Sequence, residues 1–191
     1  MMEIVVSVLV GLGLSAATGF RVFVPLLVAG IAARTGHLSL APGFEWLASD
    51  PALVALAIAT LFEVAAFYVP WLDNGLDAVA MPAAVVAGIV MTASVVVGID
   101  PWLKWALAII AGGGVAAAVQ ALTSTTRLGS TLATAGLGNP VLASLELVAS
   151  TALSLLAIAV PVVAAVILAA FLLIAFRRRA RRRAAASARA G

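Results

Sequence analysis

The chain has 191 residues, of which 64% are hydrophobic and only 10% charged, and it contains no cysteine. This composition, with a mean hydropathy of +1.22, is far more apolar than that of soluble domains and predicts a protein that crosses the membrane several times. The missing cysteines exclude disulfides, catalytic thiols and cysteine-ligated metal sites. The net charge of +3 comes from an arginine-rich tail and does not describe the rest of the chain.

Six apolar segments follow one another, and we expect all of them to be helices, because backbone exposed to lipid must satisfy its own hydrogen bonds. They cover residues 4–31, 52–69, 82–98, 102–122 with a polar continuation to 135, 141–160 and 161–176. The first residues carry Glu3 and neither lysine nor arginine, so we expect this end to be retained rather than cleaved as a signal peptide. The predicted fold class is an all-α integral membrane protein.

The first segment carries an arginine and is too long for one perpendicular span. As a single helix, residues 4–31 would extend over about 42 Å, against a hydrocarbon core of about 30 Å. A stretch of small residues, Ser15 to Gly19, lies near the middle. The segment is therefore either a pair of half-helices with Arg21 near their tip or a straight, tilted helix. An arginine at membrane depth is costly, so Arg21 predicts a buried partner or a solute path.

The second segment contains one glutamate, Glu63, and two aspartates follow it in a polar turn. We expect Glu63 to be an ion-pair partner or a proton-coupling group. Asp73 and Asp77 are four residues apart, so a helical turn places both carboxylates on one face. On a shared face the two carboxylates would hold a cation or exchange a proton. The alternative is that they belong to an ordinary turn at the membrane interface. His37 is the only histidine, and we expect no metal site and no cofactor.

The fourth segment continues into the polar stretch TSTTRLGST, residues 123–131, which surrounds Arg127 with threonine and serine. A broken helix is one interpretation of this stretch, since non-helical backbone at membrane depth is tolerated only inside protein or beside water. A straight, tilted helix whose arginine bonds a glutamate is the alternative. Broken helix ends offer free amides that, together with arginine, suit an anion. We assign Arg21, Arg127, Thr126 and Asn139 to substrate binding. Asn139 and Pro140 also fit an ordinary helix stop and turn.

The two halves of the chain contain an internal repeat. Three pairs match at one constant offset: Thr18 with Ser124, Arg21 with Arg127, and Gly30 with Gly136. Two further pairs match at smaller offsets: Glu63 with Glu146, and Pro82 with Pro161. Three crossings per unit would make the repeats inverted, as in many secondary transporters. Repeat 1 covers residues 1–98 and repeat 2 covers residues 99–176. We expect both arginines and both glutamates to converge near a pseudo-two-fold axis.

A basic tail, residues 177–191, follows the last segment. Its seven arginines are Arg177, Arg178, Arg179, Arg181, Arg182, Arg183 and Arg189. Directly after an apolar helix they predict a cytoplasmic anchor on anionic lipid headgroups rather than a nucleic-acid site. Six crossings, or four crossings with two re-entrant hairpins, place the N-terminus on the same cytoplasmic side of the cell membrane.

Three long stretches are similar to a known family. They are GLSAATGFRVFVPLL (13–27), FEVAAFYVPWLDNGLDAVAMPAAVVAG (62–88) and TSTTRLGSTLATAGLGNPVLASLE (123–146). On these motifs the chain resembles the bacterial integral membrane proteins of domain-of-unknown-function family 4126, over nearly all of its length apart from the tail. The resemblance implies a membrane location and no particular activity. Arg127, Asn139, Pro140 and Glu146 are closer to the family pattern than Phe20 and Arg21.

The expected function is transport or translocation of a small or amphiphilic anion, with the arginines as counter-charges and Glu63 and Glu146 as ion-pair or coupling groups. An ion channel is a close variant. A membrane scaffold would use the buried charges only to lock helices together. A homo-oligomer is a separate open alternative. An enzyme acting on a lipid headgroup, with Glu63, Asp73 or Asp77 as base, is less favoured, because a metal-ligand cluster is missing.

Overall fold

The structure is a computed structural model that describes residues 1–66 and 70–190, and the side chains of residues 70–78, 176, 179, 180 and 182–190 lie outside this description. The described residues form helices and turns without strands, which confirms the all-α class. The helices are α1 (Met2–Thr18), α2 (Phe23–Arg34), the short η1 (Glu45–Ala48), α3 (Asp50–Ala66), α4 (Pro70–Val95), α5 (Pro101–Leu107), the π-helical η2 (Ala108–Gly113), α6 (Gly114–Thr134), α7 (Asn139–Ala159) and α8 (Pro161–Ala190).

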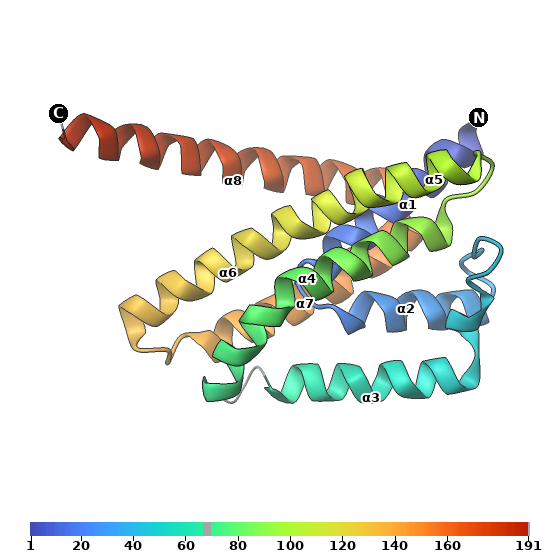
Figure 1. Ribbon diagram of the computed structural model, residues 1–191, viewed down its shortest axis with the longest axis horizontal. Helices are drawn as coiled ribbons and strands as arrows, with labels where there is room; N and C mark the ends of the chain where they lie inside the picture. The colour runs from blue at the N-terminus through green and yellow to red at the C-terminus, as the bar shows by residue number, and fades with distance from the viewer. Residues whose placement is uncertain (67–69, 191) are drawn as a thin grey trace.

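The first apolar segment is two helices, so the straight-helix alternative is wrong. α1 ends at Thr18, α2 begins at Phe23, and the chain turns back between them so that the two helices form a V with its point inside the bundle (Figure 1). Pro25 explains the break, because its ring would clash with the carbonyl four residues earlier, that of Arg21, if one helix continued. In the first turn of α2 its missing amide costs nothing.

The second arginine segment is helical throughout, so of the two alternatives left open by the sequence it takes the straight helix whose arginine bonds a glutamate. α6 passes through Arg127 to Thr134. The hydroxyls of Thr125 and Thr126 donate to carbonyls one turn earlier in the same helix, which allows a threonine-rich stretch to stay helical. When the two halves are aligned, Thr131 corresponds to Pro25. Unlike proline, threonine has a backbone amide that can donate within the helix. Matching sequences in the two halves therefore give different backbones.

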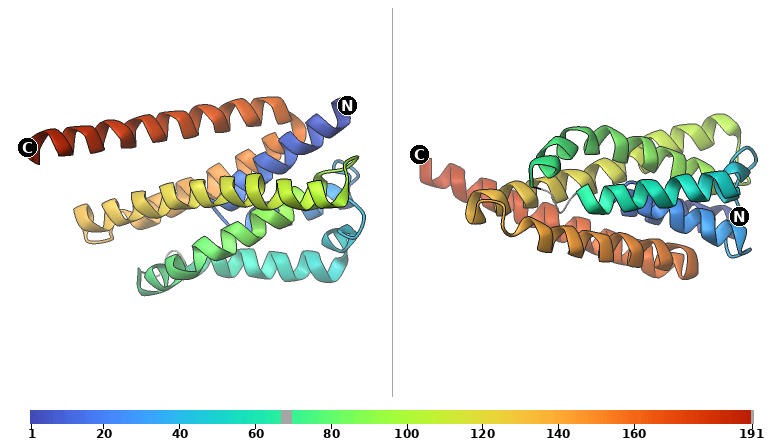
Figure 2. Two further views of the ribbon diagram at one scale, coloured as in Figure 1. Left: turned by 45° about the horizontal axis from the view of Figure 1, so that its top comes forward. Right: turned by 90° about the horizontal axis from the view of Figure 1, so that it is seen from below.

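α1 is the central helix and contacts α4, α6, α7 and α8. Its apolar residues Val10, Leu14 and Ala17 belong to the main hydrophobic core, together with residues of α4, α6 and α7. The far half of α8 leaves the bundle and carries the basic tail outward (Figures 1 and 2). The N-terminus and the end of α8 lie at opposite ends of the molecule (Figure 1), whereas six crossings would bring them to the same end.

Polar side chains lie inside the bundle and large apolar ones cover it. The buried polar residues are Ser7, Ser15, Thr18, Arg21, Glu63, Thr92, Ser94, Gln120, Thr123, Arg127, Asn139, Glu146, Ser150 and Ser154. On the outside, Leu132 is 81% exposed and Ile110 is 76% exposed. Soluble proteins rarely show this distribution. In the part of the chain that the structure describes, two helices, Pro101–Thr134 and Asn139–Ala159, are long and apolar enough to cross a membrane.

Candidate functional site

Both arginines bind the same glutamate. Arg127 on α6 donates from Nε to Oε1 of Glu146 on α7 at 2.9 Å and from Nη2 to the other carboxylate oxygen, which is a bidentate contact. Nη2 of Arg21 lies 3.7 Å from Oε2 of Glu146. All three residues are buried, with 2%, 3% and 7% exposure for Arg21, Arg127 and Glu146. Arg127 thus pairs within its own half of the chain, while the ion pair of Arg21 with Glu146 joins the two halves.

Glu63 caps the start of α2. Its Oε1 accepts the amide of Val22 at 2.6 Å, and its Oε2 accepts the amide of Phe23 at 3.1 Å. The first amides of a helix have no carbonyl partner within that helix, and its positive dipole end favours a carboxylate. Glu63 belongs to α3, so one helix supplies the cap of another. Glu63 also lies within electrostatic reach of Arg21 and Arg127. We call Arg21, Glu63, Arg127 and Glu146 the arginine–glutamate centre.

The point of the V is clamped between α6 and α7. Nη2 of Arg21 donates to the carbonyl of Ala143 on α7 at 2.8 Å. Oγ of Ser150, also on α7, donates at 3.0 Å to the carbonyl of Ala17, near the end of α1, where helix carbonyls lack partners. A Cβ on Gly19 would lie 2.6 Å from a side-chain carbon of α6, so glycine is needed for this close approach.

The other predicted binding residues lie around this centre. Thr126 is exposed on α6 and lines a pocket together with Glu146. Asn139 is buried at the start of α7, and its Nδ2 donates to Oγ1 of Thr131 at 3.1 Å, so it braces the α6–α7 turn. The backbone of α4 carries Asp73 and Asp77, whose side chains lie outside the described residues.

Several contributors were missed by the sequence analysis. Pro25 carried a recognisable signal, because a proline inside an apolar segment predicts a helix boundary. Ser150 carried none, since a single serine in an apolar helix has no distinctive pattern. The sequence analysis expected both arginines and both glutamates to converge, but it left open which glutamate each arginine contacts.

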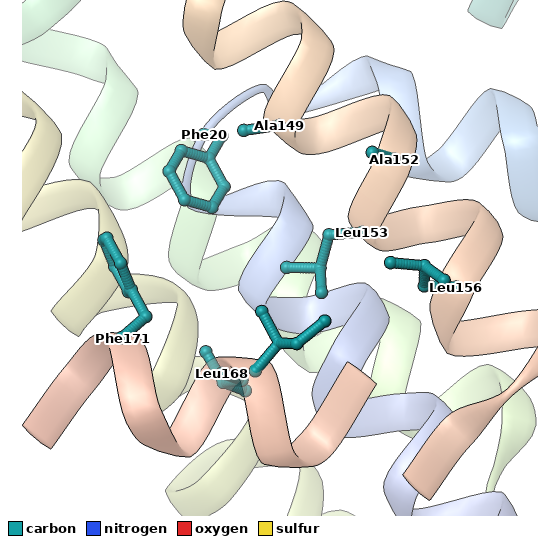
Figure 3. Close-up of a pocket in the computed structure, with 8 residues that line it drawn as sticks. Phe20, Ala149, Ala152, Leu153, Leu156, Leu168 and Phe171 are labelled. Carbon is teal, nitrogen blue, oxygen red and sulfur yellow. The ribbon is translucent and has the colours of Figure 1, made fainter. Parts of the chain in front are cut away.

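Pockets lie on two sides of the centre. A pocket of about 210 Å³ is bordered by α6, α7 and α8 and includes Glu146. It shares Phe20, Ala149 and Phe171 with an apolar pocket of about 320 Å³ between α7 and α8 (Figure 3). On the other side, a pocket of about 320 Å³ between the start of α2, α3 and α4 includes Glu63. Neither arginine lines these three pockets. Two of them reach the centre through a glutamate, Glu146 in one and Glu63 in the other, while the apolar pocket contains neither glutamate.

The centre suits anions and protons better than metal ions. It contains two guanidinium groups and two carboxylates, and removing either charge of a buried pair leaves the other uncompensated. Within residues 1–66 and 70–190, no three His, Cys, Asp or Glu side chains are grouped so that they would hold a metal ion.

A family model described as Domain of unknown function (DUF4126) matches residues 8–181, so the chain belongs to this family, as its motifs indicated. No curated protein and no solved structure matches the chain. A functional proposal for this chain therefore starts from the geometry of the centre.

Proposed function

We propose that this member of the DUF4126 family is a multi-pass membrane protein that moves a small or amphiphilic anion through the arginine–glutamate centre. The observation that carries the proposal is the convergence of Arg21 and Arg127 on the single carboxylate of Glu146. Two guanidinium groups aimed at one position form an anion site, because their planar forks match carboxylates and phosphates. Ionisable groups at membrane depth commonly mark solute paths.

The membrane arrangement follows from the apolar exterior and the direction of the helices. α7 has 21 residues and extends about 30 Å, the thickness of the hydrocarbon core. We call the continuous helical stretch formed by α5, η2 and α6 the rod. We propose that five elements cross the membrane, namely α3, α4, the rod, α7 and α8. The V of α1 and α2 is a re-entrant hairpin. This revises the expected topology, since the basic tail stays cytoplasmic while the N-terminus lies outside. The missing lysine and arginine near Met1 agree with that orientation.

Reporter fusions test this topology. Reporters at Met1 and at Gly191 should indicate opposite sides of the membrane. A reporter inserted at Gly43, in the loop between α2 and η1, should agree with Met1, because a re-entrant hairpin returns to its starting side. If the first segment instead crossed completely, Gly43 and Met1 would report different sides and the V would not be re-entrant.

Glu146 acts as the gate in the proposed mechanism. Its carboxylate occupies the position between Arg21 and Arg127 that an anion would take. When a proton neutralises Glu146, the two guanidinium groups become available to an anion entering from the adjoining pocket. Deprotonation restores the carboxylate as a competitor and expels the anion. A proton and an anion therefore move together. Glu63 keeps α2 capped, so that Arg21 stays at the point of the V during this exchange.

The variant Glu146→Gln tests the exchange, because glutamine keeps the shape of the side chain and removes its charge. An anion that fits the site should raise the melting temperature of this variant more than that of wild type, since binding to the folded state alone stabilises it. Inorganic phosphate, glycerol phosphate and acetate are suitable probes. The control is Glu45→Gln, which alters an exposed loop carboxylate. In proteoliposomes, wild-type anion uptake should rise with an inward proton gradient, and Glu146→Gln should lose this dependence.

The low exposure of Arg127 also favours a second candidate, a scaffold in which the charges only lock helices together. Substitutions of Arg127 separate the two functions. Both functions predict a lower melting temperature for Arg127→Gln, because the buried Glu146 loses its bidentate partner. For transport, wild type should show anion flux, lysine should keep part of it because it keeps the charge without the fork, and glutamine should abolish it. For a scaffold, flux should be absent in wild type as well.

A further inference from the structure

The pocket between α7 and α8 adjoins the pocket beside Glu146. They share Phe20 from the point of the V, Ala149 from α7 and Phe171 from α8. The rings of Phe20 and Phe171 lie 5.9 Å apart, centroid to centroid, and Figure 3 shows them at one end of the pocket, with the leucines of α7 and α8 further along. We call this combined space the α7–α8 groove.

The two ends of the groove differ in chemistry. The end between α7 and α8 is lined only by phenylalanine, alanine, leucine and isoleucine side chains (Figure 3). The other end holds the carboxylate of Glu146 and two threonines of α6, Thr123 and Thr126. An apolar channel that leads to hydroxyls and a buried ion pair has the polarity profile of an amphiphile, with space for a chain and a separate place for a polar head.

The groove opens to the outer surface of the bundle. Ala152 is exposed on α7, and Ile167 and Phe171 on α8 are 47% and 38% exposed. Figure 1 shows α8 diverging from α6 towards the C-terminus. In the proposed membrane arrangement this surface faces lipid, which allows a ligand to enter sideways from the bilayer.

The direction of the groove matches a lipid of the cytoplasmic leaflet. Glu146 is seven residues from the start of α7, which is about 10 Å from the end of the bundle where the basic tail leaves. The apolar end continues from there towards Leu156 and so towards the other end of α7. Arg177 and Arg178, exposed on α8 just beyond its apolar part, attract anionic headgroups to the same side.

We propose that the α7–α8 groove binds the acyl chain of an anionic membrane lipid, whose headgroup lies beside Glu146 and takes its place between Arg21 and Arg127. This assignment rests on the proposed anion exchange and narrows its substrate class to anionic lipids. The chain lies against Leu153, Leu168 and the aromatic pair of Phe20 and Phe171, and the two threonines at the polar end are positioned to bond the headgroup.

The test uses the full-length protein in phosphatidylcholine nanodiscs that contain a small fraction of lipid with a photoreactive acyl chain. One preparation carries the label on phosphatidylglycerol and the other on phosphatidylcholine. We expect phosphatidylglycerol to label groove residues of α7 and α8 about tenfold more than phosphatidylcholine does, which corresponds to about 1.4 kcal/mol. Equal labelling by both lipids, or labelling spread evenly over the outer helix faces, would overturn the assignment.

A matched pair of variants controls for position. Ala152→Trp fills the apolar end of the groove, and Ala170→Trp makes the same change on α8 at an exposed position outside it. Both alanines are exposed, so neither tryptophan must enter the core. Ala152→Trp should reduce the labelling of the groove at least several-fold, and Ala170→Trp should leave it unchanged. Undiminished labelling in a normally melting Ala152→Trp protein would contradict the groove as the binding place.

The lipid assignment and the transport function fail in different ways. If proteoliposomes show proton-dependent uptake of inorganic phosphate while groove labelling lacks selectivity for phosphatidylglycerol, transport stands and the lipid site is wrong. If labelling is selective but fluorescent phosphatidylglycerol does not exchange between the leaflets and no small anion is taken up, the lipid site stands and the proposed transport is wrong.

Discussion

The two arginine segments start from similar sequences and reach the same glutamate by different routes. Arg127 is carried by an uninterrupted helix, α6, whereas Arg21 lies in the four-residue connection between α1 and α2. The backbone near Arg127 satisfies its own hydrogen bonds. The backbone near Arg21 depends on groups from other helices, above all Glu63 and Ser150.

The difference shows that similar sequences in the two halves can carry an arginine on different backbones. Proline at position 25 is incompatible with a continuous helix, whereas threonine at position 131 allows one. The consequence is a structural asymmetry, because a continuous helix holds Arg127 while Arg21 depends on supports from other helices. The substitutions below separate these two kinds of support.

The largest effect is expected from Glu146→Gln, which removes the partner shared by both arginines. Breaking a buried ion pair costs about 3–5 kcal/mol, and in detergent or nanodiscs this should lower the melting temperature strongly. Adding Arg127→Gln should restore part of the loss, because Arg21 and Glu63 then balance each other. Purely additive damage in the double variant would show that Arg127 and Glu146 do not interact directly.

Thr131→Pro should make the second segment resemble the first. Proline at this position clashes with the carbonyl of Arg127 and costs about 3 kcal/mol or more in a helix interior. We expect a lower melting temperature and reduced helix content by circular dichroism. Thr131→Ala, which loses only the bond to Asn139, is the control and should cost about 1 kcal/mol. Equal stability of the two variants would mean that α6 does not need to be continuous here.

Glu63→Gln should weaken the cap of α2 while leaving α6 intact. Hydrogen bonds to a charged group contribute about 1.5–3 kcal/mol, and glutamine keeps only one acceptor oxygen for the amides of Val22 and Phe23. Faster hydrogen exchange at these two amides, with unchanged exchange near Arg127, is the expected result. The control is Asp50→Asn, which breaks the exposed pair with Arg34 and should cost less than about 1 kcal/mol. If the amides of Val22 and Phe23 exchanged as slowly in Glu63→Gln as in Asp50→Asn, Glu63 would not be their cap.

The smallest effect is expected from Pro25→Ala. The substitution removes the steric cause of the break, but Glu63 and the clamp between α6 and α7 still hold the V. Greater freedom of the unfolded chain should cost about 0.4–1 kcal/mol, measured as a small shift of the thermal midpoint. A loss as large as that of Thr131→Pro would show that proline, rather than tertiary contact, maintains the V.

The sequence was sufficient for the features that depend on composition and local pattern. Helical segments and the charged residues of the centre follow from hydrophobicity and the cost of a buried charge. The length of the first segment and the threonines of residues 123–131 each left a broken and a continuous helix as alternatives. Threonine hydroxyls bond to backbone carbonyls within α6, and that segment is continuous, whereas the first segment is broken. The position of Arg21 against Glu146 depends on how α1 packs against α7, and no local pattern encodes that contact.

The π-helical turn at Ala108–Gly113 has a consequence for the direction of Arg127. A π turn closes its hydrogen bonds over five residues instead of four, so it accommodates one additional residue and rotates everything downstream by about 100°. At this turn Gly112 packs so closely on α4 that an added Cβ would lie 2.8 Å from the carbonyl oxygen of Gly88. The turn therefore sets the rotational phase of the whole rod. Deleting one of its residues would turn the guanidinium of Arg127 away from Glu146.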